Sequence, residues 1–305
     1  WGAKSMEDCI TMDRDAEFSM GQFLWTGFDY IGEPTPYHTK NSYFGQLDTA
    51  GFPKDSYYMF RSAWTDVKKA PMVHVYPYWD FNVGQTVDVR ACTNGCAVEL
   101  FVNGVSKGKQ PIDHAHGQVL QGTWQVNYEP GEITAVAYDE MGAEIARETR
   151  YSFGDGVKLY IKANKNVLRG DGEDLVFLEI GVLDEKNHPV ENAMNYVEVL
   201  VKGAGRLLGL DNGDSTDYEE YKGNVRKLFN GKLLAVVASK PMLGEVEITV
   251  NSKGLESATL LLKTKASPVR QGSCATENLM NTPMTLSEVI PVRRIDIKAP
   301  EGTLL

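Results

Sequence analysis

The sequence predicts a mainly β protein in which two β-sandwiches follow a short barrel-like or α/β segment. Two observations support this prediction. The spacing of apolar residues changes from helical to alternating near Val73, and short alternating stretches with turn residues between them then continue to about Lys263. Alternation places successive side chains on opposite faces of a strand, and many short strands at this spacing are typical of a sandwich.

The first segment, residues 1–70, contains the predicted helices. Met6–Ala16 is polar and weakly helical. The short apolar and aromatic run Gln22–Trp25 predicts a buried strand. The prolines within Gly32–Tyr37 then exclude both helix and central strand.

A stronger helix is predicted at Asp55–Trp64. Asp55 or Ser56 can cap its start. Residues at three- and four-residue spacing then form one apolar face: Tyr57, Phe60, Ala63 and Trp64.

The first sandwich is predicted at residues 71–153. Asn103–Gly104 is a strong hairpin signal because both residues readily adopt the positive φ that a tight turn requires. The alternating stretches that predict its strands are Thr86–Ala91, Val98–Val102, Trp124–Tyr128 and Thr134–Tyr138.

The second sandwich is predicted at residues 154–266, after a junction at Phe153–Gly156. Glycines at 203, 205, 209 and 213 predict bends and close backbone approaches. Residues 267–305 are an irregular tail with one further strand predicted at Ile290–Ile297. The strands predicted in the second sandwich are Lys158–Ala163, Leu175–Leu183, Tyr196–Val201, Leu233–Ala238, Glu245–Asn251 and Ala258–Lys263.

Composition excludes some partners. A length of 305 residues predicts two or three domains, and a net charge of −10 argues against nucleic acid or an anionic membrane. No apolar run is long enough to cross a bilayer. Because the chain starts at Trp1, we expect it to be cut from a longer protein, so any targeting segment would lie upstream. A periplasmic or extracellular compartment is slightly favoured.

The four cysteines are too few for a disulfide framework, and no cysteine or histidine spacing fits a zinc site. Cys92 and Cys96 flank a turn and could form a disulfide, although two reduced thiols are favoured. We therefore expect no metal and no cofactor.

Three motifs, in order along the chain, resemble glycoside hydrolase family 2. Gly21–Tyr37 (GQFLWTGFDYIGEPTPY), with Ser42–Lys54 and the following helix, is similar to the eighth strand and last segment of the family's catalytic (β/α)8 barrel. Glu99–Gly108 and Trp124–Gly131 are similar to the sandwich after the barrel in its β-galactosidases. The third motif is similar to a further C-terminal immunoglobulin-like domain, and it combines Gly209–Asp214 with Arg226–Gly231.

This resemblance implies a retaining glycosidase that acts on terminal β-linked sugars, with β-galactosides as the expected substrate. Such enzymes use two carboxyl groups, which in this family are glutamates at the ends of the fourth and seventh barrel strands. No Asn-Glu pair precedes Glu191, which belongs to the second predicted sandwich. The glutamates are therefore expected upstream of Trp1, no catalytic residue is assigned, and the chain alone is expected to be inactive.

Trp25, Asp29 and Glu33 are the candidate substrate-binding residues. Trp25 is predicted at the C-terminal end of a barrel strand, the face where such barrels build their sites, and an indole suits the apolar face of a sugar. By resemblance it lines the sugar pocket and precedes a cis peptide bond, Trp25–Thr26. Carboxylates at Asp29 and Glu33 could accept hydrogen bonds from sugar hydroxyls. The alternatives are a core tryptophan, a turn cap at Asp29, and a solvated or lysine-paired Glu33.

Other polar residues have a simpler interpretation. The acidic cluster could suggest calcium, but a solvated turn is favoured; it comprises Asp211, Asp214, Asp217, Glu219 and Glu220. The histidines at 74, 114, 116 and 188 are interpreted as surface residues. Trp79 and Trp124 could form a sugar-binding platform, but core positions are favoured.

Three hypotheses follow for function: part of an enzyme, a carbohydrate-binding module, or a structural module that supports a barrel or an oligomer interface. Expected partners are the carbohydrate substrate, the missing N-terminal domains, and a second copy in a homo-oligomer. A single barrel strand lacks hydrogen-bonded neighbours. We therefore expect residues 1–65 to be poorly ordered, rearranged or involved in chain contacts.

Overall fold

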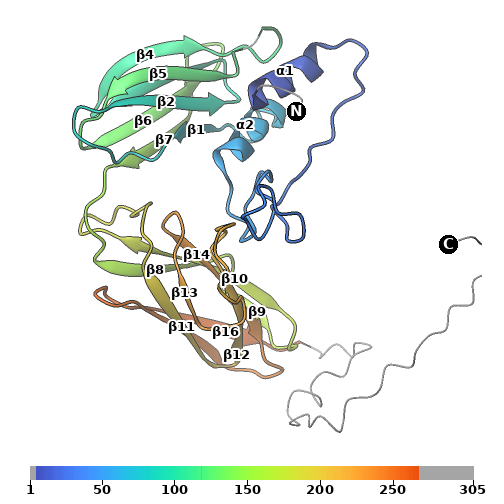
Figure 1. Cartoon of the computed structure of the whole chain (residues 1–305), viewed down its shortest axis with the longest axis vertical. Coiled ribbons are helices and arrows are strands. Elements are labelled where there is room, and N and C mark those ends of the chain that lie inside the picture. Colours follow the sequence, from blue (N-terminus) through green and yellow to red (C-terminus); the bar gives the residue numbers. More distant parts are fainter. Residues whose placement is uncertain (1–4, 118, 268–305) are drawn as a thin grey trace, which may run out of the picture. The chain divides into compact units, whose positions relative to one another are not determined.

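The computed structural model describes residues 5–117 and 119–267, which belong to one compact unit. Figure 1 shows strands from about residue 73 onward and two short helices before them. The prediction of a mainly β protein with two sandwiches is confirmed. The strand predicted at Ile290–Ile297 and Cys274 lie outside the described residues.

The first sandwich consists of a three-stranded sheet, β1-β2-β5, and a four-stranded sheet, β4-β3-β6-β7. All of its strand pairs are antiparallel. Alternate residues of β2 and β3, such as Val89 and Leu100, enter the core together with Trp79. The strands are β1 (Val73–Tyr76), β2 (Thr86–Thr93), β3 (Ala97–Val102), β4 (Val105–Pro111), β5 (Gln121–Asn127), β6 (Glu132–Tyr138) and β7 (Glu144–Tyr151).

The Asn103–Gly104 hairpin joins β3 to β4, as predicted. Both residues have positive φ, 49° and 76°, and Val102 pairs with Val105 across the turn. The Asn103 side chain also accepts a hydrogen bond from the Glu132 amide at 2.9 Å. The turn is therefore fixed both by backbone preference and by the neighbouring strand.

The second sandwich consists of the sheets β12-β14-β10-β8 and β13-β11-β15-β16-β9. Its core is aliphatic, with Leu178, Ile180 and Ile248 fully buried. The glycines make the close approaches that were predicted, since a Cβ at Gly209 would lie 2.6 Å from the Tyr221 carbonyl oxygen. The strands are β8 (Lys158–Ala163), β9 (Val167–Arg169), β10 (Leu175–Leu183), β11 (Tyr196–Gly203), β12 (Gly205–Asp211), β13 (Val225–Lys227), β14 (Lys232–Ser239), β15 (Glu245–Asn251) and β16 (Ala258–Lys265).

Two helices, α1 (Met6–Asp15) and α2 (Asp55–Trp64), precede the sandwiches. Ile10 of α1 and Phe60 of α2 share a small core with Cys92 and Leu120 of the first sandwich. The predicted cap of α2 was wrong, because the helix starts after Lys54 without a side-chain cap. The apolar face predicted for α2 was also wrong in part, since Phe60 is buried but Trp64 is not.

The buried residues of α2 are Met59, Phe60 and Ser62, whereas Trp64 is 56% exposed. The helix therefore packs on the first sandwich through a face rotated from the apolar one. Ser62 tolerates this burial because its hydroxyl donates a hydrogen bond to the Met59 carbonyl at 2.7 Å.

The buried strand predicted at Gln22–Trp25 is not formed, and this prediction was wrong. Residues 19–24 have no regular structure, and Phe23 is fully exposed. The physical reason is the lack of a neighbour, since a strand requires hydrogen-bonded partners and the described residues supply none for this run. The expectation that residues 1–65 are poorly ordered, rearranged or involved in chain contacts stays a prediction.

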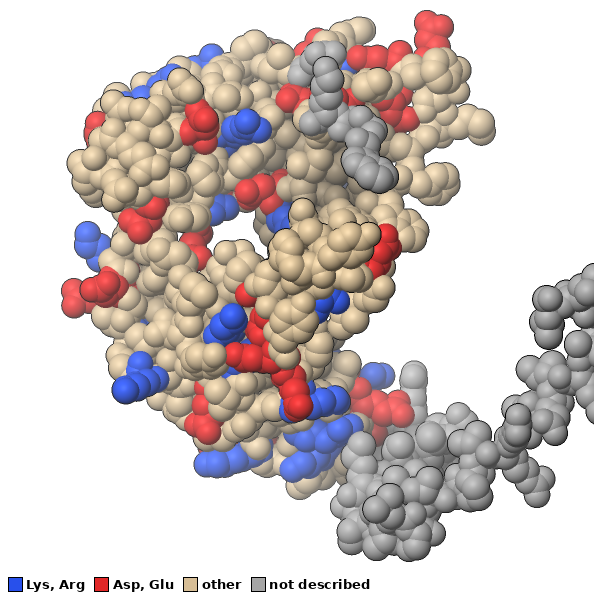
Figure 2. All heavy atoms as spheres, viewed as in Figure 1, with Lys and Arg blue, Asp and Glu red and all other residues tan. Residues whose placement is uncertain are grey.

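The described surface has mixed charge. Acidic and basic side chains are interspersed on the face shown in Figure 2. Among the described residues, no helix is both long and apolar enough to cross a membrane. Among the cysteines in the described part of the chain, Cys9, Cys92 and Cys96 are free, so Cys92 and Cys96 are not paired with each other, as favoured.

Candidate functional site

The candidate site lies in residues 25–54, here called the Trp25 segment. This segment folds back on itself through isolated β-bridges rather than through a helix or a sheet, including Phe28 with Leu47 and Ile31 with Asn41. Ser42 donates its amide to the Tyr30 carbonyl at 3.0 Å, and the Tyr30 amide donates to the Ser42 hydroxyl at 3.1 Å. Residues 28–35 are therefore held against residues 41–47.

Trp25, Tyr30 and Glu33 form a connected group on one side of this segment. The Trp25 indole N–H donates to the Tyr30 hydroxyl at 3.2 Å, and that hydroxyl donates to Glu33. The two rings meet edge to face at 6.1 Å, and the hydrogen bond with Glu33 raises the pKa of Tyr30. Trp25 remains 71% exposed, so its ring can receive a ligand next to a carboxylate.

The Trp25–Thr26 peptide bond is cis, as the resemblance implied. The Trp25 side chain is exposed in the described part of the chain, and its place in a sugar pocket stays a prediction. Tyr30, which was not among the candidate residues, connects Trp25 to Glu33. The three-residue spacing of Tyr30 and Glu33 in a loop was the signal that could have linked them.

Asp29 has a different environment from Glu33. Its side chain is buried, and Lys54 Nζ lies 2.7 and 2.9 Å from its two oxygens. The Gly45 amide also donates to Asp29 at 2.8 Å, and a Cβ at Gly45 would lie 2.2 Å from the Asp29 nitrogen. Asp29 therefore fixes the fold of the Trp25 segment. This role is closer to the alternative of a turn cap than to sugar binding.

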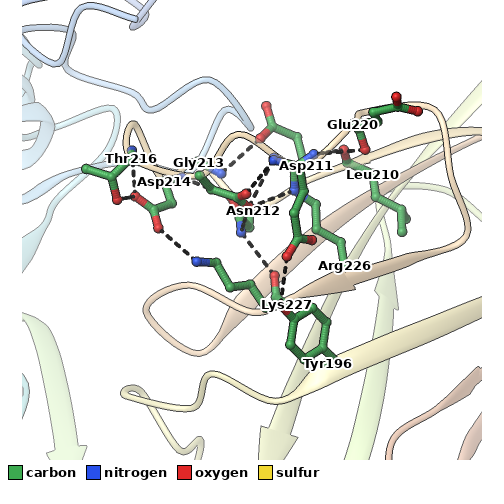
Figure 3. Close-up of polar contacts among 12 residues, drawn as sticks. Tyr196, Leu210, Asp211, Asn212, Gly213, Asp214, Thr216, Glu220, Arg226 and Lys227 are labelled. Carbon is green, nitrogen blue, oxygen red and sulfur yellow. Dashed lines mark hydrogen bonds and ion pairs between the residues drawn. The ribbon is translucent and has the colours of Figure 1, made fainter. Parts of the chain in front are cut away.

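The acidic cluster, shown in Figure 3, was predicted to be a solvated turn, and this prediction was wrong for Asp214 and Asp217. Both side chains are buried, and Asp217 lies 3.2 Å from the guanidinium of the fully buried Arg226. Lys227 lies 3.7 Å from Asp214. Each buried carboxylate thus has a cation partner.

Burial alone would raise the pKa of Asp217. The Glu219 amide, the Asn212 side chain and the Arg226 charge outweigh it and hold the pKa below its usual range. Among the residues that the structure describes, no group of three potential ligands is placed to hold a metal ion. The cluster is therefore a structural ion-pair network.

The surface interpretation was wrong for His74, which is 2% exposed. It lies between α2 and the first sandwich, with Asp55 at 3.0 Å and Glu148 at 3.1 Å from its two ring nitrogens. His116 is exposed, whereas His114 is half-buried and has its pKa lowered mainly by that burial. His188 is half-buried and stacks on Tyr151 at 4.4 Å.

Trp79 and Trp124 occupy the core of the first sandwich, with exposed fractions of 0% and 7%. Their indole nitrogens donate to the Glu129 and Gly108 carbonyls, both at 3.2 Å. The core interpretation is therefore confirmed, and these residues offer no sugar-binding platform.

Comparison with known proteins agrees with the order of these elements. Residues 159–261 match the family described as glycoside hydrolase family 2 C-terminal domain 5, and residues 84–146 match a domain of unknown function, DUF4982. A β-galactosidase of Bacteroides ovatus is 39% identical over 265 residues, which cover 85% of this chain and 30% of that protein. The chain belongs to glycoside hydrolase family 2.

Other relatives in glycoside hydrolase family 2 have different names. A putative β-glucuronidase of Formosa agariphila is 30% identical, over 81% of this chain and 25% of that protein. A crystal structure of a β-glycosidase from Bacteroides vulgatus has a TM-score of 0.75 and 33% identity, over 81% of this chain and 31% of that chain. The chain thus spans between a quarter and a third of the length of these relatives.

Proposed function

We propose that the chain is the C-terminal part of a retaining glycoside hydrolase that acts on terminal β-linked sugars, with β-galactosides as the substrate class. In this proposal the Trp25 segment forms part of the sugar pocket. Trp25 stacks on the apolar face of the sugar ring, and Glu33 accepts hydrogen bonds from its hydroxyl groups. The catalytic glutamates belong to other parts of the enzyme, so this chain alone is inactive.

The observation that carries the proposal is the exposed indole of Trp25 beside the Glu33 carboxylate. Trp25 directly follows residues 19–24, which pair with no described strand. Large apolar side chains are exposed along the same stretch and would be covered by neighbouring barrel strands. They are Phe18, Met20, Phe23, Phe28 and Ile31. The greater length of the relatives supports a parent enzyme that contains such strands.

The charges of the segment favour a neutral sugar over a glucuronic acid. Its two cations are Lys40 and Lys54. Lys54 is paired with Asp29, and the Lys40 ammonium lies 4.8 Å from the centre of the Tyr221 ring. Glu33 would repel a sugar carboxylate placed next to Trp25. We therefore expect an aryl β-galactoside to be a better substrate than an aryl β-glucuronide.

Steady-state kinetics of the longer enzyme that contains this chain test the proposal. Trp25→Ala is expected to lower kcat/KM for an aryl β-galactoside by about tenfold to a hundredfold, because burying a large apolar side chain contributes about 1.5–3 kcal/mol. Trp64→Ala is a matched control, since Trp64 is also exposed but lies at the end of α2. Equal losses in both variants, or turnover by the isolated chain, would contradict the proposal.

The alternative of a carbohydrate-binding or structural module remains a second candidate. The aromatic residues that suggested a binding platform are in the core, so this candidate depends on the sandwiches as supports. The sandwiches contact the helices and the Trp25 segment, which favours a supporting role within the enzyme. A homo-oligomer, if one forms, would be detected by the mass of the enzyme in solution.

A further inference from the structure

The second sandwich contacts the Trp25 segment directly, through main-chain as well as side-chain groups. The Lys40 amide donates to the Ser215 carbonyl at 2.9 Å. The Tyr218 hydroxyl donates to the His38 carbonyl at 3.1 Å. The contact between Lys40 and Ser215 joins two main-chain groups, so it fixes the path of the segment without depending on a flexible side chain.

Two further contacts occur at the same place. The Lys40 ammonium is buried, has no hydrogen-bond partner among the described residues and lies over the Tyr221 ring. Burial is the main cause of its lowered pKa. Gly213 has a φ of 76° and faces Asp48, so a Cβ at position 213 would lie 2.1 Å from Asp48 Oδ2. This glycine is required for the close approach as well as for its own backbone conformation.

The sandwich side of these contacts is rigid. Ser215 and Tyr218 belong to the loop that contains Asp214 and Asp217, and both carboxylates are paired with cations of the adjoining strand. Arg226 also lies 4.9 Å from the centre of the Tyr221 ring, on which Lys40 rests. The buried network of Figure 3 therefore fixes the surface that receives the segment.

The segment side leads to the candidate sugar-binding residues. Lys40 is followed by Asn41 and Ser42, which pair with Ile31 and Tyr30. Tyr30 in turn contacts both Trp25 and Glu33. A displacement at Lys40 would thus be transmitted through two residues of main chain to the Tyr30 hydroxyl.

We infer that the second sandwich positions the sugar-binding residues, with Gly213, Ser215 and Tyr218 acting as positioning residues for Trp25 and Glu33. This inference rests on the proposed function and deepens it. The sandwich residues do not touch the sugar themselves. They set the geometry of the pocket through the Trp25 segment, so their loss weakens sugar binding rather than the chemical step.

Gly213→Ala is the variant that tests this, because its new methyl group clashes with Asp48. Gly172→Ala is the matched control: Gly172 belongs to the same sandwich and also has positive φ, 84°, but a Cβ there meets only Pro241 at 3.5 Å. Both variants carry the same backbone cost, and only Gly213→Ala disturbs the Trp25 segment. Adding Asp48→Ala removes the clashing carboxyl group and is expected to rescue Gly213→Ala.

The first measurement is hydrogen exchange of residues 38–48 in this chain. We expect exchange to be faster than wild type in Gly213→Ala and equal to wild type in Gly172→Ala. In the double variant Gly213→Ala/Asp48→Ala, exchange should be slower than in Gly213→Ala alone. Unchanged exchange in Gly213→Ala, or equal acceleration in the control, would overturn the inference. This measurement requires no activity and decides the contact independently of the proposed function.

The second measurement is kinetics of the longer enzyme with an aryl β-galactoside. We expect Gly213→Ala to raise KM about fivefold with little change in kcat, and Gly172→Ala to change neither. Faster exchange with an unchanged KM would overturn the positioning role. A wild-type enzyme that hydrolyses no aryl β-glycoside would instead overturn the proposed function and, with it, the role in sugar binding, while the exchange result would still report the contact.

Discussion

His74 connects α2 to the first sandwich through two charged hydrogen bonds. Its ring nitrogens lie 3.0 Å from Asp55 Oδ1 and 3.1 Å from Glu148 Oε2. The ring also stacks on Tyr58 at 3.7 Å. His74→Phe keeps a flat ring for the stack and removes both hydrogen bonds, so it isolates the polar contribution.

The expected cost follows from the two partners. Hydrogen bonds to charged groups contribute about 1.5–3 kcal/mol each when they are buried, whereas exposed ion pairs contribute about 0–1 kcal/mol. The Glu148 side chain is 30% exposed and that of Asp55 is 55% exposed. We therefore expect His74→Phe to cost about 2 kcal/mol, most of it from the contact with Glu148.

The pH dependence has a definite sign. Burial alone would lower the pKa of His74, but the hydrogen bonds with Asp55 and Glu148 outweigh it and raise the pKa above its ordinary value of 6.5. The stabilisation is therefore fully present below about pH 6.5 and is lost as the pH rises through the folded-state pKa. The cost of His74→Phe should be larger near about pH 6 than near about pH 9.

Glu148 limits this window on the acid side. Burial alone would raise its pKa, but the hydrogen bond and charge of His74 hold it below the ordinary value of 4.5. Its contribution is therefore present above about pH 4.5 and is lost as the pH falls through the folded-state pKa. Near about pH 6 both partners are charged, which makes this pH the appropriate one for the larger effect.

Hydrogen exchange of residues 55–64 measures the opening free energy of α2 at each pH, after correction for intrinsic rates. His116→Phe is the control, because His116 is exposed. If His74→Phe lowers the opening free energy of α2 equally at both pH values, the charged state of His74 is refuted. A loss no larger than that of the control would refute the role of His74 in holding the helix.

Three further predictions concern other buried groups. Asp217→Ala leaves the fully buried Arg226 without a counter-charge, so we expect a loss of about 3–5 kcal/mol in urea unfolding, and a loss below about 1 kcal/mol would contradict this. Burial raises the pKa of Asp48 from 3.8 to about 6, so the cost of its ionisation to folding grows as the pH rises between these two values and is constant above about pH 6. Asp48→Asn should therefore slow exchange of residues 46–53 near about pH 7.5 and do so less near about pH 4.5, and a larger gain at the acid pH would count against the argument. Burial raises the pKa of the Cys92 thiol to about 12, whereas Cys96 is exposed. In a Cys274→Ser background, an aromatic disulfide reagent should therefore label Cys96 in the native protein and Cys92 only after denaturation. Equal labelling rates for Cys92 and Cys96 in the native protein would disprove this.

The strands that the sequence predicted are apolar or alternating stretches, such as β3 and β6. β3 and β10 were located to within one residue, because their alternate side chains enter a core. β4 and β7 were not predicted. β4 is largely exposed and β7 carries charged residues on both faces, so neither has an apolar period to recognise.

The long-range polar contacts could not be predicted. His74 pairs with residues at positions 55 and 148, and Asp29 pairs with Lys54, so only the folded chain brings these charges together. The prediction of Trp25 as an accessible aromatic came from a motif. The prediction of a strand around it depended on neighbours that the described residues do not contain.

The pairing of β16 with β9 constrains the order in which the protein can assemble during synthesis. β9 (Val167–Arg169) is parallel to β16 (Ala258–Lys265), the last strand of the second sandwich, and Lys263 pairs with Val167. A ribosome makes β9 long before its partner, whereas the first sandwich is complete once β7 has emerged. The first sandwich can therefore fold before the last strand of the second sandwich has been synthesised. A polypeptide released before Lys265 would leave the sheet that contains β9 with an unpaired edge.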